Sequence, residues 1–283
     1  MNIKSLISIP FIICSLSTIL FSNDKVITMG YKDISKMPLI GEKNDNFGLY
    51  FDLFSKAAKK IGYKLKIKRY PKKRIHSGLK DGTIDFYPGS SFSQKRAEYL
   101  YYLPNGLSTK EVLVSIMSQP EISDMNKVKG TLIVERGSSK LDWDKIYTDL
   151  KIIELSELSM EKVIKALKYN RGDFYIADIE VVDYYKKLNN LNKYSDINIK
   201  IHNMSINKDF VPMYLGFSRK SKLFSEKKNL EYDKHKLTFI DNFPTIIDKN
   251  SVAYKFFVAL DELKKEKITN KLYGKYFKNL VDH

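Results

Sequence analysis

The sequence repeats one pattern, in which a helix ends, the chain turns at a glycine and a buried strand follows. The first copy, residues 79–98, reads LKDGTIDFYPGSSFSQKRAE, and the second, residues 167–178, reads LKYNRGDFYIAD. Because both copies carry Asp-Phe-Tyr in the strand, we expect two lobes of similar construction. The first copy runs on to a small-residue loop and Arg96, and the second ends at Asp178. A cationic group after one strand and an anionic group after the other predict a cleft whose two sides carry opposite charge.

Such a cleft suits a small zwitterion. A zwitterion loses hydration when it is buried, so both of its charges need partners within the site. Partners on separate lobes make ligand binding favour the closed form, because only closure brings both of them within reach of the ligand.

The composition is that of a globular protein with a basic surface. The chain has 283 residues, of which 43% are hydrophobic and 29% charged, and its formal net charge is +16. Lysines are mixed with acidic residues along the whole chain, and they form neither a basic stripe nor a motif typical of nucleic-acid binding. We therefore interpret the charge as a solvated lysine-rich surface and expect no nucleic-acid partner.

The N-terminal segment has the features of a secretory signal peptide. Residues 6–21 are almost wholly apolar or hydroxylated, and Ser22 provides a small residue before a cut at Asn23. An uncleaved membrane anchor is the alternative, but the apolar stretch is short for a span and contains Pro10. We expect residues 1–22 to be removed and the mature protein to be periplasmic.

The mature chain lacks the motifs that are typical of most catalytic and metal sites. The single cysteine, Cys14, lies in the signal segment, and Ile12 and Ile13 precede it where lipid attachment requires small residues. Neither disulfides nor thiol chemistry is therefore expected. The four histidines share no metal-ligand spacing, and no phosphate-binding glycine loop is present. We expect no cofactor, no metal ion and no catalytic residue.

Strands and helices alternate along the rest of the chain. The predicted strands span residues 26–30, 64–69, 83–87, 112–117, 131–135, 151–155, 173–177, 198–201 and 213–217. The predicted helices span residues 47–61, 72–80, 93–100, 160–167, 179–188, 251–267 and 268–280, with a further helix after the turn at 137–139. This alternation predicts an α/β protein with mostly parallel sheets flanked by helices.

Two of these strands read as crossings between the lobes, at residues 112–117 and 213–217. The second lobe is then an insertion into the first. Residues 23–113 and 215–283 form lobe 1, residues 114–214 form lobe 2, and the two crossing strands act as a hinge. Residues 223–250 fit no regular pattern.

In their order and spacing, these motifs resemble the family 3 extracellular solute-binding proteins, the receptors of amino-acid uptake transporters. Leu79, Gly82 and Asp85 match the Leu-x-x-Gly-x-x-Asp start of the family's first-lobe motif. The loop from Gly89 to Arg96 matches its Gly-x-Thr/Ser-x-Thr/Ser-x-x-Arg pattern. The resemblance implies a two-lobed periplasmic-binding-protein fold of type II.

Three further segments carry the same resemblance. Residues 172–178, GDFYIAD, keep the shape of the family's second-lobe pattern Gly-x-x-Asp-Ala-x-x-x-Asp. Residues 137–139, GSS, match the turn that begins its second lobe, and residues 259–277, ALDELKKEKITNKLYGKYF, resemble its C-terminal helix pair. The resemblance covers nearly all of the mature chain.

The resemblance implies ligand-binding roles for the matching residues. Arg96 is expected to hold a ligand carboxylate through two parallel hydrogen bonds. Asp178 is expected to bind the ligand ammonium. The remaining contacts are expected from two small-residue turns, Gly89-Ser90-Ser91 in lobe 1 and Ser138-Ser139 in lobe 2, the latter at a helix start that favours an anion.

The chain departs from the family at one position of the cleft. Members often carry an aromatic residue near residues 71–73 that stacks on the ligand, but this chain has Lys72, Lys73 and Arg74 there. Tyr31 or Tyr87 is then left to supply the ring. The basic trio favours an acidic or polar ligand.

Each candidate residue also has a purely structural explanation. Arg96 could pair with Glu98 on a surface helix, and Asp178 could cap the helix that follows it. Ser138 and Ser139 could be an ordinary helix N-cap.

The sequence therefore predicts a monomeric receptor that captures a small zwitterion, a polar amino acid, and delivers it to an inner-membrane ABC-type permease. Two alternatives use the same fold. One is an enzyme resembling cyclohexadienyl dehydratase, for which Glu180 is a candidate acid. The other is a ligand-sensing module that acts on a signalling partner.

Overall fold

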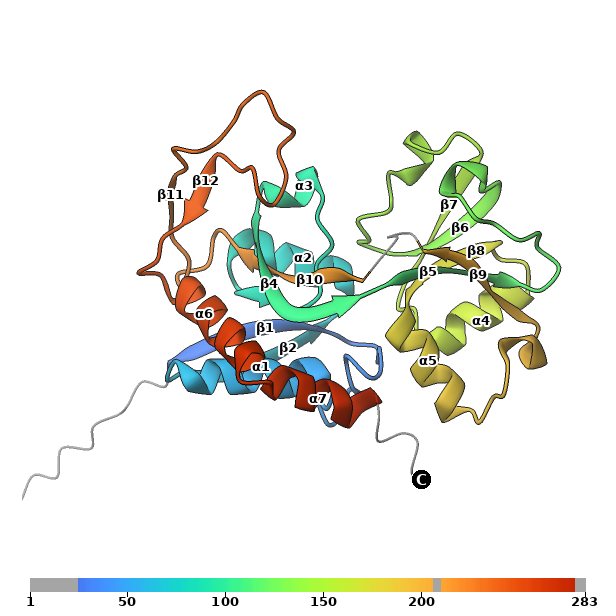
Figure 1. Ribbon diagram of the computed structural model, residues 1–283, viewed down its shortest axis with the longest axis horizontal. Helices are drawn as coiled ribbons and strands as arrows, with labels where there is room; N and C mark the ends of the chain where they lie inside the picture. Colours follow the sequence, from blue (N-terminus) through green and yellow to red (C-terminus); the bar gives the residue numbers. More distant parts are fainter. Residues whose placement is uncertain (1–24, 206–209, 278–283) are drawn as a thin grey trace, which may run out of the picture.

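The chain folds into two lobes, each built on a five-stranded sheet (Figure 1). The computed structural model describes residues 25–205 and 210–277. The predicted signal peptide, residues 1–22, lies outside the described residues. Within them, every helix is too short or too polar to cross a lipid bilayer.

Lobe 1 contains the two ends of the chain. Its sheet has the strand order β2 (Lys64–Tyr70), β1 (Val26–Lys32), β3 (Phe86–Tyr87), β10 (Val211–Ser218) and β4 (Leu100–Thr109). Its helices are α1 (Leu49–Lys60), α2 (Lys72–Asp81), α3 (Gln94–Ala97), α6 (Val252–Lys265) and α7 (Ile268–Phe277). A small antiparallel ribbon, β11 (Glu226–Lys228) and β12 (Thr245–Ile247), lies in the segment without a predicted pattern.

Lobe 2 repeats this plan. Its sheet has the order β7 (Leu150–Leu155), β6 (Gly130–Glu135), β8 (Phe174–Asp178), β5 (Glu111–Ile116) and β9 (Ile199–Ser205). Its helices are α4 (Met160–Lys168) and α5 (Ile179–Leu188), with short 3₁₀ turns η1 (Met125–Lys127), η2 (Trp143–Lys145) and η3 (Tyr194–Ile197). In both sheets the first three strands are parallel, and the fourth is antiparallel to both of its neighbours.

The repeated aspartate binds the backbone of the neighbouring strand in both lobes. Asp85 accepts a 2.7 Å hydrogen bond from the backbone N–H of Thr28 in β1. Asp173 accepts a 2.7 Å bond from the backbone N–H of Thr131 in β6. Each aspartate thereby joins the third strand of its sheet to the neighbouring parallel strand at the point where pairing begins. The prediction of two similarly built lobes is confirmed.

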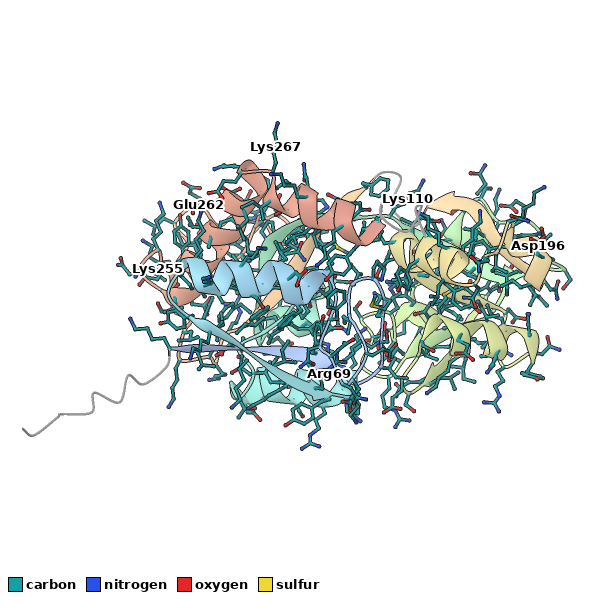
Figure 2. All side chains as sticks on the ribbon, turned by 90° about the horizontal axis from the view of Figure 1, so that it is seen from below. Arg69, Lys110, Asp196, Lys255, Glu262 and Lys267 are labelled. Atoms are coloured by element: carbon teal, nitrogen blue, oxygen red, sulfur yellow. The ribbon has the colours of Figure 1, made fainter. Side chains whose placement is uncertain are left out.

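The chain passes from lobe 1 to lobe 2 along one extended segment. Strand β4 ends at Thr109 and β5 begins at Glu111, so Lys110 alone lies between the two sheets (Figure 2). The chain returns to lobe 1 with β10, which pairs with β3 and β4. The strands predicted at 112–117 and 213–217 correspond to β5 and β10, but β5 pairs within the sheet of lobe 2 and β10 within that of lobe 1, so neither strand itself crosses and the outward crossing lies at Lys110.

Strand β4 is the longest strand that the sequence pattern did not reveal. It contains Pro104, Asn105 and Gly106, which are typical of a turn. The strand accepts them because it lies at the edge of the sheet, where the pairing with β10 is irregular next to Pro104. The fully buried amide of Asn105 binds the carbonyl oxygen of Pro88 and the N–H of Leu107.

Two predicted helices are much reduced in the structure. The helix predicted at 93–100 is the single turn α3, because Leu100 already belongs to β4. The turn at 137–139 is followed only by the short η2. The helices predicted at 72–80, 179–188 and 268–280 correspond to α2, α5 and α7, the last described as far as Phe277.

The core of lobe 1 is centred on the phenylalanine of the first repeat. The ring of Phe86 is fully buried and lies 5.1 Å from that of Phe54, 5.2 Å from that of Phe256 and 6.1 Å from that of Phe217. These rings come from β3, α1, α6 and β10, so one side chain joins the sheet to the helices on its face.

We expect Phe86→Ala to lower the free energy of unfolding by about 3–5 kcal/mol, because it leaves a cavity among three other rings. Phe210→Ala is the matched control, since that ring is exposed. Urea unfolding of both variants measures the difference. Equal losses in the two variants would show that Phe86 is not the centre of this core.

Candidate functional site

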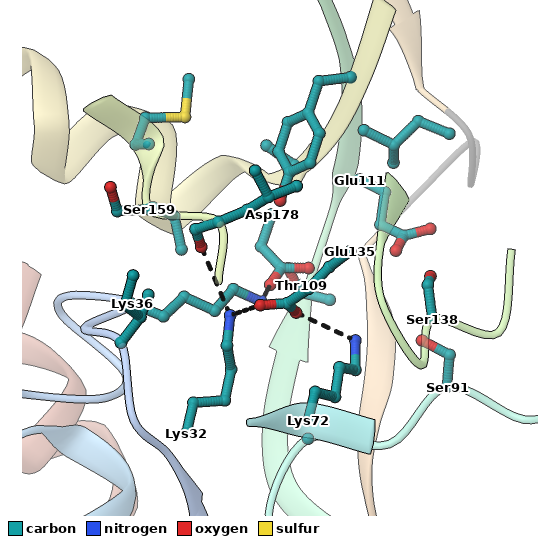
Figure 3. A pocket seen from close by; sticks show the side chains of 18 of the residues that line it. Lys32, Lys36, Lys72, Ser91, Thr109, Glu111, Glu135, Ser138, Ser159 and Asp178 are labelled. Atoms are coloured by element: carbon teal, nitrogen blue, oxygen red, sulfur yellow. Dashed lines mark hydrogen bonds and ion pairs between the residues drawn. The ribbon is translucent and has the colours of Figure 1, made fainter. Parts of the chain in front are cut away.

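A cleft of about 1220 Å³ lies between the two lobes (Figure 3). Its walls include the carboxyl ends of parallel strands from both sheets, where β1 ends at Lys32, β3 at Tyr87, β6 at Glu135 and β8 at Asp178. Open α/β sheets commonly place their binding sites at this edge. Of the residues expected to bind ligand, Gly89, Ser90, Ser91, Ser138, Ser139 and Asp178 line the cleft.

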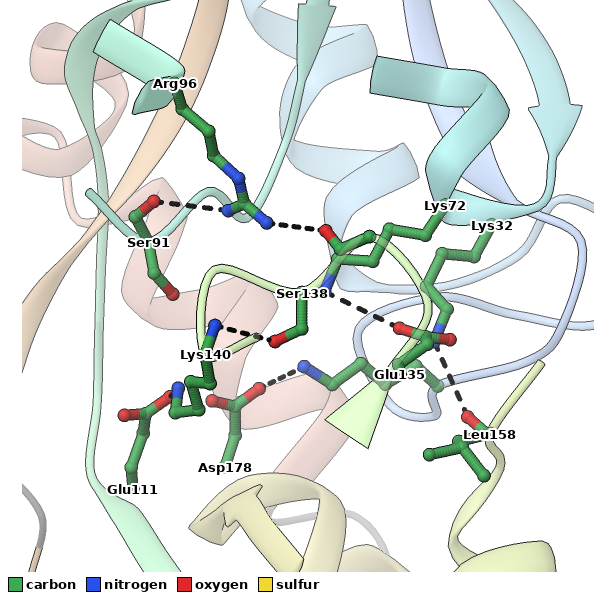
Figure 4. Close-up of polar contacts among 12 residues, drawn as sticks. Lys32, Lys72, Ser91, Arg96, Glu111, Glu135, Ser138, Lys140, Leu158 and Asp178 are labelled. Carbon is green, nitrogen blue, oxygen red and sulfur yellow. Dashed lines mark hydrogen bonds and ion pairs between the residues drawn. The ribbon is translucent and has the colours of Figure 1, made fainter. Parts of the chain in front are cut away.

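Arg96 lies at the boundary between the lobes, beside the cleft, and is not itself one of the residues lining it. Its guanidinium donates a 3.3 Å hydrogen bond to the carbonyl oxygen of Ser91 in lobe 1 and a 2.6 Å bond to that of Gly137 in lobe 2 (Figure 4). The side chain is buried. It therefore holds together the two small-residue turns that the sequence predicts to contact the ligand, and both of its partners are neutral oxygens.

Tyr31 is not in the cleft. Its fully buried hydroxyl donates to the carbonyl oxygen of Leu39, and the guanidinium of Arg69 lies 4.8 Å from its ring centre. The aromatic rings of the cleft include Tyr87 and Tyr175, the tyrosines of the two Asp-Phe-Tyr repeats. Because successive side chains of a strand point to opposite faces, the repeat buries its phenylalanine and presents its tyrosine to the cleft.

Of the three basic residues that follow β2, only one faces the cleft. Lys72 lines the cleft, whereas Lys73 does not, and the guanidinium of Arg74 lies over the ring of Tyr70, 4.3 Å from its centre. Only Lys72 can therefore influence a ligand directly.

Ion pairs between the lobes occupy the centre of the cleft. Lys32 forms a 2.5 Å ion pair with Glu135, and Lys72 approaches the other oxygen of the same carboxylate at 3.5 Å. Lys36 pairs with Asp178. The three lysines belong to lobe 1 and the two carboxylates to lobe 2 (Figure 3). No local pattern in the sequence marks Lys32, Lys36 or Glu135, because lysine and glutamate occur throughout the chain.

These pairs shift the pKa values of their members. Burial raises the pKa of the Asp178 carboxyl, but the ammonium of Lys36 outweighs it and the pKa lies below its usual value. Burial likewise opposes ionisation of Glu135, yet Lys72 and Lys32 hold its pKa below the ordinary range. Burial, assisted by the charge of Arg96, lowers the pKa of Lys72 to about 7. Both carboxylates are therefore ionised at neutral pH.

Arg69 fixes the loop that carries Lys36 (Figure 2). Its guanidinium donates to the carbonyl oxygens of Lys32, Gly41 and Glu42 at 2.7–2.9 Å and to the side-chain oxygen of Asn46 at 2.7 Å. The fully buried Leu39 and Ile40 and a backbone hydrogen bond from Leu49 to Pro38 anchor the same loop. Arg69 thus helps to fix the loop from which Lys36 reaches Asp178 of lobe 2.

Lys140 and Glu111 form a second polar group on the lobe 2 side, with a 2.6 Å ion pair. The backbone N–H of Lys140 also donates to the hydroxyl of Ser138. Among residues 25–205 and 210–277, no cluster of histidine and acidic side chains has the arrangement of a metal site. The groups gathered in the cleft are suited to binding charge through hydrogen bonds.

Glu180 lies behind the cleft, near the hinge. It is buried and accepts a 2.7 Å hydrogen bond from the hydroxyl of Thr109, and the hydroxyl of Tyr273 lies 3.5 Å from its other oxygen. Burial raises the pKa of this carboxyl to about 7. Its contacts join α5 of lobe 2 to β4 and α7 of lobe 1, and it is not among the residues that line the cleft.

A family model described as "Bacterial extracellular solute-binding proteins, family 3" matches residues 27–279 of this chain. The chain belongs to this family. The match spans both lobes and both crossing segments, so the resemblance expected from the motifs is confirmed. No curated protein sequence matches the chain.

Solved structures of similar fold include several binding proteins. An ancestral arginine-binding protein bound to arginine is 20% identical, with a TM-score of 0.64 over 89% of this chain and 98% of its own. The substrate-binding protein AbpA from Streptococcus pneumoniae, bound to L-arginine, is 14% identical, with a TM-score of 0.65 over 93% and 98%. The GluR0 ligand-binding core from Nostoc punctiforme, bound to L-glutamate, is 16% identical, with a TM-score of 0.61 over 89% and 99%. These likenesses show the two-lobed type II fold.

Close approach of the lobes depends on a glycine of lobe 2. Gly137 has a backbone φ of +83°, and a Cβ at this position would lie 3.1 Å from the backbone of Lys73 in lobe 1. Gly62 has a similar φ of +75°, but a Cβ there would meet nothing within 4 Å. The two glycines therefore share their backbone requirement and differ only in the contact between lobes.

We expect Gly137→Ala and Gly62→Ala to lose about the same stability, roughly 1–2 kcal/mol, from the left-handed backbone. Only Gly137→Ala should also strain the contact between the lobes, which must then shift by a few tenths of an ångström at Lys73. Urea unfolding should therefore give Gly137→Ala a larger loss of stability than Gly62→Ala. Equal losses in the two variants would contradict the role of Gly137 in the contact between the lobes.

Proposed function

We propose that this protein is an extracytoplasmic receptor that captures a small amino-acid solute between its two lobes and delivers it to an ABC-type permease of the inner membrane. In this proposal the N-terminal segment directs export and is cleaved, and the mature receptor acts as a monomer in the periplasm. Membership of the solute-binding family supports the receptor role.

The observation that carries the proposal is the separation of charge across the cleft. Lobe 1 contributes three lysines that line the cleft and Arg96 beside it, and lobe 2 contributes Glu135 and Asp178. An amino acid carries a carboxylate and an ammonium on one carbon atom. Its carboxylate fits the donors of lobe 1 together with the turn at Ser138, and its ammonium fits Asp178.

Capture would depend on closure. A ligand that touches both lobes binds the closed form more tightly than the open form, and it shifts the population by that difference in affinity. The guanidinium of Arg96 already donates hydrogen bonds to the carbonyl oxygens of Ser91 and Gly137, which are both neutral. A ligand carboxylate that enters between these two turns would therefore form a charge-assisted hydrogen bond with a buried guanidinium that has no anionic partner in the protein. A permease could then distinguish loaded from empty receptors by the arrangement of the lobes.

The two alternatives differ from a transport receptor in the step after ligand capture. A sensor module would use the same cleft, and the similar fold of the GluR0 ligand-binding core supports keeping it as a second candidate. A dehydratase needs an acid that reaches its substrate. The position of Glu180 behind the cleft, in contact with Thr109, disfavours that residue as the acid.

A screen of amino acids by thermal unfolding tests the proposal. A ligand present at a hundred times its dissociation constant stabilises the folded state by about 2.7 kcal/mol, which is readily seen as a rise in melting temperature. Arg96→Ala should abolish this rise. Arg171→Ala, which removes an exposed arginine of lobe 2 away from the cleft, should keep it.

Two results would contradict the proposal. One is a full stabilisation of Arg96→Ala by the same amino acid, which would remove Arg96 from the binding site. The other is chemical conversion of the bound solute by the purified protein, which would favour the enzyme.

A further inference from the structure

The charged side chains that meet between the two lobes do not balance. We define the central charge cluster as Lys32, Lys36, Lys72, Arg96, Glu135 and Asp178. It holds two carboxylates and four basic side chains, of which Lys72, with a pKa of about 7, is partly charged at neutral pH. Glu135 is shared by two lysines, and the guanidinium of Arg96 contacts only carbonyl oxygens.

The remaining charges around the cleft do not correct this excess. Lys140 pairs with Glu111 and Lys165 with Glu161, so each of these pairs is neutral. The other charged groups of the rim are exposed to solvent, where ions screen them: Glu42, Asp45 and Lys168. The imbalance therefore belongs to the central charge cluster, which is largely shielded from solvent and where an uncompensated charge is costly.

We propose that the ligand of this cleft carries two carboxylate groups, so that acidic amino acids or small dicarboxylates bind and the corresponding amides do not. A basic solute would add to the excess of positive charge, and a neutral zwitterion would leave it unchanged. A solute with two carboxylates reduces it.

The cationic groups form two separate positions that match two carboxylates. One is Arg96, between the turns at Ser91 and Gly137. The other is formed by Lys32 at the end of β1 and Lys72 at the start of α2, which both face Glu135 (Figure 4). Lys72 approaches Glu135 only at 3.5 Å, beyond a normal hydrogen bond, so its ammonium retains donors for a second carboxylate.

Lys36 competes with the α-ammonium of a ligand for Asp178. In the closed structure the ammonium of Lys36 is the ion-pair partner of the Asp178 carboxylate. The ammonium of an acidic amino acid would replace Lys36 there, and the released lysine could pair with the second carboxylate of the ligand. A dicarboxylate without an amino group would leave the Lys36–Asp178 pair intact.

The pKa of Lys72 is consistent with an excess of positive charge. Burial lowers it to about 7, and the charges of Arg96, Lys32 and Lys36 lower it while only Glu135 raises it. A bound carboxylate favours the charged lysine and so raises this pKa. Binding above pH 7 should therefore take up a proton, and affinity should fall as the pH rises above 7, by at most tenfold per pH unit.

The test compares solutes that differ in a single group, by calorimetric titration of the full mature protein. L-glutamate and L-aspartate are compared with L-glutamine and L-asparagine, and with glutarate and succinate. Because the inference rests on capture of a solute in this cleft, Arg96→Ala is titrated in parallel. We expect the acidic members to bind at least about tenfold more tightly than their amides. An amide cannot form one of the charge-assisted hydrogen bonds that the second carboxylate makes, and the loss of one such bond corresponds to about this factor in affinity.

Lys72→Met tests the second cationic position, since methionine keeps the apolar stem and removes the charge. It should weaken dicarboxylate binding about 10- to 100-fold and reduce the discrimination against amides. Lys73→Met is the matched control, because this neighbour is exposed and outside the cleft. Titration of the unaltered protein at pH 8, in two buffers of different ionisation enthalpy, independently measures the proton uptake.

The outcomes separate this inference from the proposed function. Equal affinity for an acidic amino acid and its amide, or no proton uptake on dicarboxylate binding, would overturn the inference. If neutral amino acids bind and Arg96→Ala abolishes that binding, the proposed receptor function remains supported even though the inference of a ligand with two carboxylates fails. Binding of glutarate or succinate but of no amino acid supports two carboxylates and overturns the amino-acid receptor.

Discussion

Ion pairs between lysines of lobe 1 and carboxylates of lobe 2 are the interaction on which the closed molecule depends. They form because both sheets direct the carboxyl ends of their parallel strands at the same gap, which brings Lys32 opposite Glu135. In a buried gap such pairs are favourable only when both partners are present, since removing one leaves an unpaired charge. The arrangement therefore gives closure a strong dependence on the charge of any molecule that occupies the cleft.

The repeated Asp-Phe-Tyr sequence explains why two sheets of separate sequence meet so symmetrically. In each copy the aspartate binds the backbone of the neighbouring strand, the phenylalanine enters the core and the tyrosine faces the cleft. Three consecutive residues thus fix strand register, packing and one wall of the site. A short strand such as β3 (Phe86–Tyr87) can carry this role because the aspartate before it supplies the bond that further ladder pairs would provide.

The sequence predicts the architecture better than it predicts the site. Helical spacing and alternation identify most helices and parallel strands, because these depend on local periodicity. They fail at β4, whose Pro104-Asn105-Gly106 is accepted only through tertiary contacts at a sheet edge. In the site, motif spacing places the small-residue turns and Asp178 at the cleft. It does not reveal Lys32, Lys36 or Glu135, because their function arises from facing across the gap, and no local pattern marks that.

The closed structure also shows why charge rather than shape should govern selectivity. Every solute must compete with interactions that the protein already makes with itself, so its affinity is the free energy of its own interactions less that of the internal ones it displaces. A neutral amino acid that takes Asp178 displaces Lys36 and leaves that partly buried lysine without its ion-pair partner. A solute that brings its own second carboxylate pairs the displaced lysine again. The internal pair Lys36–Asp178 thus disfavours ligands that supply an ammonium for Asp178 but no carboxylate for Lys36.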